Sequence, residues 1–143
     1  MIGMILSIVA GAAMSLQGVF NARLADKVGV YESNAFVHGT AFALALAVMF
    51  AFGNGGLSNL GAANKIYWLG GVLGIVITVT VMLAIGDLGP AFAVSVILIS
   101  QLLVAAVIDA FGLFGTEQAP FGLSKWLGMG LMIAGVVVFK VKV

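Results

Sequence analysis

Five apolar segments, each long enough to cross a membrane as a helix, follow one another along this chain of 143 residues. Crossing the hydrocarbon core takes about 20 helical residues, and the backbone must satisfy its own hydrogen bonds there. The composition agrees, since 63% of the residues are hydrophobic and 8% are charged, against about 25% charged in an ordinary soluble domain. The sequence therefore predicts an all-α integral membrane bundle in a lipid bilayer. One transmembrane domain, residues 1–143, is expected, with spans at 2–22, 33–53, 66–85, 91–114 and 122–140.

The residue inventory argues against several classes of function. The absence of cysteine excludes disulfides and thiolate metal sites, and with one histidine and five carboxylates we expect no metal site and no cofactor. The histidine has no neighbouring nucleophile with an acidic partner, so we expect no enzyme. A net charge of +1 offers no basic patch, so nucleic acid is not an expected partner.

Basic residues are divided between the two membrane faces with only a small bias. An odd number of spans puts the termini on opposite sides. The positive-inside rule then places the C-terminus in the cytoplasm, but the difference is small enough that insertion in both orientations stays open. One face carries Arg23, Lys27, Lys140 and Lys142, and the other carries Lys65 and Lys125.

Small residues recur at helical spacing in three of the spans. Lipid provides no hydrophobic drive for helix association, so close backbone approach at small residues is a common source of packing energy. These positions predict tight helix packing, either within one chain or between two chains. They are Gly11, Ser15 and Gly18 in the first span, Gly70 and Gly74 in the third, and Gly128 and Gly135 in the fifth.

In each of three predicted helices, the polar residues are spaced four or eight residues apart and therefore form a stripe on one helix face. Polar and charged groups inside a span are costly unless they are paired or hydrated, and they usually face a bundle interior or a water-filled cavity. The stripes predict a polar-lined path for a solute. The predicted lining residues are Gln17, Asn21, Asn34, His38, Gln101 and Asp109.

Each stripe has a structural alternative. The Gln101 amide is as well suited to bonding between helices as to lining a path. Asp109, near the end of its span, is as well explained by an anchor paired with Lys125 or a lipid headgroup as by contact with a solute. His38 is either a partner in an interhelical hydrogen bond or a proton relay, because imidazole titrates near neutral pH.

Four segments together resemble one family over essentially the whole chain: SLQGVFNARLADKVG, WLGGVLGIVITVT, DLGPAFAVSVILISQLLVAAVIDAFGLFG and WLGMGLMIAGVVV. The most specific part is Gln101-Leu102 followed by Asp109-x-Phe111-Gly112-Leu113-x-Gly115, and Gln17-Gly18-x-x-Asn21 is next. This pattern is similar to the YdcZ-like family, the half-size, five-helix, bacterial inner-membrane branch of the drug/metabolite transporter superfamily. The chain departs from the family at Ser100, where glycine is more frequent.

The resemblance implies a transport role and a ten-helix unit built from two chains, either two copies or this chain and a homologue. Half-size members of the superfamily commonly insert in both directions and pair antiparallel. The small multidrug exporters of the superfamily exchange protons for cations at a glutamate in the first helix, whereas this chain offers Gln17 there. We therefore expect a secondary transporter or exporter of a small metabolite or drug-like solute, working by alternating access. The alternative is a non-transporting membrane subunit whose polar residues only bond helices together.

Overall fold

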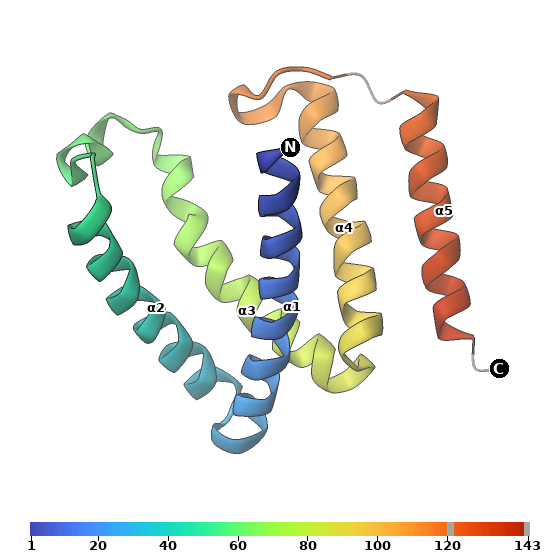
Figure 1. Cartoon of the computed structure of the whole chain (residues 1–143), viewed down its shortest axis with the longest axis horizontal. Helices are drawn as coiled ribbons and strands as arrows, with labels where there is room; N and C mark the ends of the chain where they lie inside the picture. The colour runs from blue at the N-terminus through green and yellow to red at the C-terminus, as the bar shows by residue number, and fades with distance from the viewer. Residues whose placement is uncertain (120–121, 142–143) are drawn as a thin grey trace. The chain divides into compact units, whose positions relative to one another are not determined.

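The computed structural model describes residues 1–119 and 122–141, and within them it is built of helices and connecting turns (Figure 1). Five helices are long and apolar enough to cross a membrane, which confirms the predicted all-α class and the predicted number of spans for the described residues. Four of them are α1 (Ile2–Val28), α2 (Val30–Phe52), α4 (Pro90–Phe111) and α5 (Leu123–Lys140), and the third, Lys65–Leu88, consists of a 3-10 helix followed by α3 (Gly70–Leu88). Three short 3-10 helices lie between the α-helices: η1 (Leu57–Ala62), η2 (Lys65–Leu69) and η3 (Leu113–Gly115). Lys142, counted above among the basic residues of one membrane face, lies outside the described residues.

The helices and the predicted spans differ at their ends because a helix does not have to stop where an apolar segment stops. α1 continues past Arg23 to Val28, and one glycine then separates it from α2. Gly29 has φ 100° and ψ 154°, a conformation that glycine adopts at little cost. At the start of the third span, Lys65–Leu69 is a 3-10 helix, and the Asn64 side chain accepts a hydrogen bond from the Ile66 amide at 3.1 Å.

The described chain divides into two compact units, Met1–Asp87 and Leu88–Val143. In the first unit α1 runs directly into α2 (Figure 1), and the buried residues come from all three of its long helices. These are Gly18, Asn21 and Ala22 of α1, Ser33 and Asn34 of α2, and Met82 and Ile85 of α3. Three of them are polar, while large apolar side chains such as Phe42 and Leu44 are exposed. This distribution is the one expected of helices surrounded by lipid.

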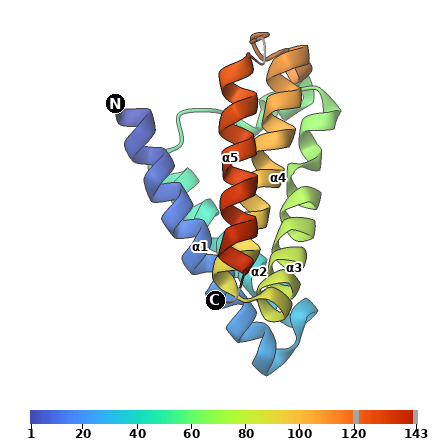
Figure 2. The ribbon, with the colours of Figure 1, turned by 90° about the vertical axis from the view of Figure 1, so that its right-hand side faces the viewer.

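In the second unit α4 and α5 lie side by side (Figures 1 and 2). α4 ends at Gly112, which has φ 59° and ψ 36°. The chain then folds back on the helix end, so that two of its last carbonyl groups have partners. The Ala119 amide donates to the Asp109 carbonyl at 2.9 Å, and the Gln118 side-chain amide donates to the Ala110 carbonyl at 2.9 Å.

Candidate functional site

Four of the six predicted lining residues belong to the first unit. Gln17 and Asn21 of α1 line a small cavity with Thr78 of α3, while Asn34 and His38 lie one turn apart on α2. We call the five residues Gln17, Asn21, Asn34, His38 and Thr78 the α1–α3 polar cluster. Two contacts connect α2 to the other helices near these residues. Ser33, which precedes Asn34, donates to the Asn21 carbonyl of α1, and the His38 ring lies against Gly74 of α3.

The cavity between α1 and α3 has a volume of about 50 Å³. That is room for a few water molecules, and its amide and hydroxyl groups provide the polar partners that buried water needs. Gly18 brings the two helices together here, because a Cβ atom at this position would lie 2.9 Å from Ile85 Cδ1 and 3.2 Å from Val81 Cγ1. The close approach of α1 and α3 at Gly18 therefore positions Gln17 and Asn21 beside Thr78.

Asn34 carries the most unusual polar atom of the cluster. The residue is 8% exposed, yet its Oδ1 accepts no hydrogen bond from any described residue. A buried acceptor without a partner costs about 1–3 kcal/mol, and such groups are rare enough in native proteins that each requires a physical reason. An amide oxygen in this position is suited to accept a hydrogen bond from a molecule that enters the cluster.

His38 is held by its own helix and faces α3. Its Nδ1 lies 3.0 Å from the Asn34 carbonyl oxygen, and because a carbonyl only accepts, Nδ1 is the donor. The other ring nitrogen, Nε2, would lie 3.5 Å from a Cβ atom at Gly74. The glycine at 74 thus leaves room for the imidazole against α3.

Ser33, which sequence reasoning missed, connects α2 to α1. Ser33 is fully buried, and its hydroxyl donates to the Asn21 carbonyl of α1 at 3.2 Å. Thr78 was also missed, although a threonine four residues after Gly74 in an apolar span is a recognisable signal. Its hydroxyl donates to the Gly74 carbonyl at 2.9 Å.

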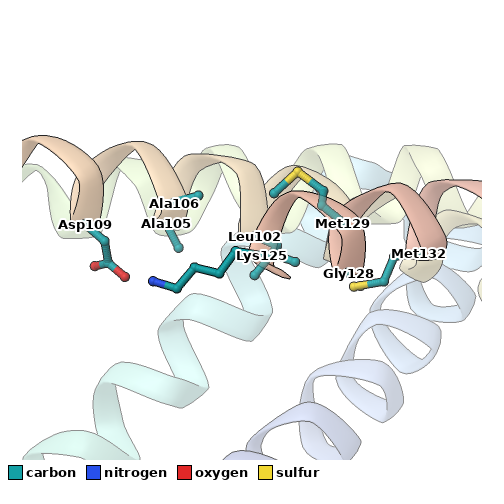
Figure 3. A pocket seen from close by; sticks show the side chains of 8 residues that line it. All are labelled: Leu102, Ala105, Ala106, Asp109, Lys125, Gly128, Met129 and Met132. Carbon is teal, nitrogen blue, oxygen red and sulfur yellow. The ribbon is translucent and has the colours of Figure 1, made fainter. Parts of the chain in front are cut away.

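The remaining predicted lining residues, Gln101 and Asp109, belong to α4 in the second unit. Asp109 lines a groove of about 520 Å³ between α4 and α5 together with Lys125, whereas Gln101 is exposed on α4 and does not line it. Figure 3 shows the Lys125 side chain extended toward the Asp109 carboxylate.

The predicted packing positions fall into three groups. Gly18 and Gly74 have side-chain atoms from another helix within 4 Å of an added Cβ. The Ser15 hydroxyl donates to the Gly11 carbonyl of its own helix at 3.1 Å. No atom of the described residues lies within 4 Å of an added Cβ at the other four glycines, which are Gly11, Gly70, Gly128 and Gly135.

Comparison with known proteins identifies a family. Neither the curated proteins nor the solved structures include a match to the chain. A family model with the description "Putative inner membrane exporter, YdcZ" matches residues 2–138. The match runs from the start of α1 into the last turn of α5. The chain therefore belongs to the YdcZ family of inner-membrane proteins, and its five candidate spans make it a multi-pass protein.

Proposed function

We propose that the chain is a secondary exporter of a small polar or amphiphilic solute, and that the α1–α3 polar cluster contacts this solute. The observation that carries the proposal is the buried Asn34 Oδ1 without a partner among the described residues. The amide, hydroxyl and imidazole groups of the cluster come from α1, α2 and α3. A solute with hydrogen-bond donors pairs with these acceptors, and its departure leaves water in the cavity.

The unit that transports is a dimer whose two chains insert in opposite directions. An inverted partner brings its Asp109 to the membrane depth of His38, and the two Gln101 side chains then lie near the midplane. Alternating access around such a central site is the mechanism of many transporters built from inverted repeats. The sequence contains no nucleotide-binding motif, so an ion, proton or solute gradient drives transport.

Export is testable without knowing the solute. Cells producing the wild-type chain, Asn34→Ala or Ser7→Ala are grown side by side, and the small molecules in their media are compared by untargeted mass spectrometry. Ser7 is the control because its exposed hydroxyl bonds to the Gly3 carbonyl of its own helix. We expect at least one solute to accumulate in the medium with the wild-type chain and Ser7→Ala, and not with Asn34→Ala.

Identical media from all three strains, at equal amounts of membrane-inserted protein, would contradict export through this cluster. That result would favour the structural alternative, in which the polar groups only connect helices. Purification of the chain in stable complex with a larger membrane assembly would then be the expected companion finding.

A further inference from the structure

We propose that the groove between α4 and α5 is a binding site for one phospholipid with a zwitterionic, primary-amine headgroup. The headgroup pairs with Asp109 and Lys125, and one acyl chain lies along the groove. The site consists only of residues of the second unit, and the inference holds whether or not the chain exports a solute.

The groove runs along both helices. Its first part, of about 520 Å³, extends from Asp109 and Lys125 to Met132, and a second hollow of about 330 Å³ continues past Gly135 to Ser95 and Phe139. Met132 lines both parts. Asp109 and Ser95 are about 21 Å apart along α4, which exceeds the depth of one leaflet, about half of the 30 Å hydrocarbon core.

The two charged residues stand where headgroups lie. Asp109 is next to the end of α4 at Phe111, and Lys125 is in the first turn of α5, which begins at Leu123. At the opposite end of the same helix pair, the Lys140 ammonium lies 5.1 Å from the centroid of the Phe92 ring, as expected of a basic residue at a membrane surface. The groove therefore begins at one membrane face and extends toward the other.

The charge pattern selects the headgroup. A carboxylate and an ammonium that point toward each other (Figure 3) are complementary to a ligand that carries both signs, with its phosphate at Lys125 and its ammonium at Asp109. An anionic headgroup is repelled by Asp109. A quaternary ammonium has no N–H to donate, so it forms no charge-assisted hydrogen bond with the carboxylate.

The floor of the groove suits a hydrocarbon chain. The first part is lined by apolar residues such as Leu102, Ala105 and Met129, apart from the two charges. At Gly128 and Gly135 no described atom lies within 4 Å of an added Cβ, so the surface there is open and flat. An apolar helix from a second copy would also cover this surface, and the variants described below distinguish it from a lipid.

The test uses the purified full chain in detergent, mixed in turn with phosphatidylethanolamine, phosphatidylcholine and phosphatidylglycerol, with bound lipid measured by native mass spectrometry. We expect the primary-amine zwitterion to bind about fivefold more tightly than either of the others, the size expected for one partly exposed ion pair. Asp109→Asn and Lys125→Gln should each remove this preference. Asp87→Asn and Lys65→Gln make the same charge changes outside the groove and should keep it.

Two further variants distinguish a lipid in the groove from a second protein chain in the groove. Exchanging the charges, with Asp109→Lys and Lys125→Asp in one chain, keeps a zwitterionic pair and should keep the preference for the primary amine. Gly128→Leu fills the groove and should weaken lipid binding. Gly130→Leu is the matched control, because Gly130 does not line the groove. An added Cβ at Gly130 also meets no described atom within 4 Å.

Equal binding of the three lipids, or equal binding by Gly128→Leu and Gly130→Leu, would overturn the proposal. If Gly128→Leu converts a two-chain species to single chains while lipid binding is unchanged, the groove is an interface between copies and the lipid assignment is wrong. If Gly128→Leu does not fold, the variant with exchanged charges tests the lipid assignment instead. Loss of the preference for the primary amine in the charge-exchange variant would also contradict the assignment.

Discussion

At the scale of single residues, Asn34 allows a functional role to be distinguished from a structural role, because its replacement should affect export and stability differently. Its buried Oδ1 has no partner among the described residues, so truncation removes an unfavourable desolvation. We expect Asn34→Ala to leave the free energy of unfolding unchanged or to raise it by up to about 3 kcal/mol, while abolishing export. Thermal unfolding in detergent and the comparison of media measure the two effects separately. A large loss of stability with export retained would assign Asn34 to packing.

Gly18 and Gly11 belong to the same stripe of α1 but differ in their surroundings. An added Cβ at Gly18 meets Ile85 Cδ1 at 2.9 Å, whereas at Gly11 it meets no described atom within 4 Å. We expect Gly18→Leu to lower the free energy of unfolding by about 1–3 kcal/mol through overpacking between α1 and α3. Gly11→Leu should leave it unchanged or raise it slightly, because leucine favours the helix. Denaturant titration of both variants in the same detergent tests this difference, and equal effects would contradict it.

At the scale of elements, one buried hydroxyl connects α1 to α2. The Ser33 side chain donates to the Asn21 carbonyl at 3.2 Å and is fully buried. We expect Ser33→Ala to cost about 1 kcal/mol of stability, the usual net value of one hydrogen bond. Ser15→Ala is the control, since the Ser15 hydroxyl bonds within α1. The expectation fails if both variants have the same melting temperature.

The end of α4 depends on a side chain from the following loop. Gln118 donates to the Ala110 carbonyl at 2.9 Å, and its removal leaves that carbonyl unsatisfied. We expect Gln118→Ala to speed amide hydrogen exchange over residues 109–119 by about fivefold, equivalent to about 1 kcal/mol. Glu117→Ala, at an exposed neighbouring position, should leave exchange in this segment unchanged. Equal exchange in both variants would show that the loop holds its place without Gln118.

At the scale of the whole molecule, the small charge bias leaves insertion in both orientations open, and the proposed antiparallel dimer requires it. Reporters fused to the C-terminus, one active only in the cytoplasm and one only outside, should give comparable signals. Lys65→Gln increases the bias and should shift the chain toward a cytoplasmic C-terminus. Arg23→Gln decreases the charge bias and should shift the chain away from a cytoplasmic C-terminus. This variant also loses an exposed 3.5 Å contact with Asp26, but such a contact contributes little stability. A single orientation in all three chains would exclude an antiparallel homodimer.

Part of the candidate site was predictable from the sequence because residues four positions apart in a helix lie on the same face. The pairs Gln17 with Asn21 and Asn34 with His38 follow from a spacing of four residues. The contact of His38 with α3 at Gly74 and the burial of Ser33 did not follow, because they depend on which faces of different helices meet. The helix ends were also displaced, as at Val28 of α1, since a helix continues beyond its apolar segment when nothing breaks it.

Hydropathy and length alone determined that this chain forms membrane-spanning helices, because lipid allows few other backbone conformations. The same physics makes most apolar positions equivalent, since any of them is stable against lipid. The partners of the small and polar residues were therefore decided by tertiary packing. Gly18 lies against Ile85 while Gly11, on the same stripe, has no described neighbour within 4 Å of an added Cβ, and only the arrangement of α1 and α3 distinguishes the two.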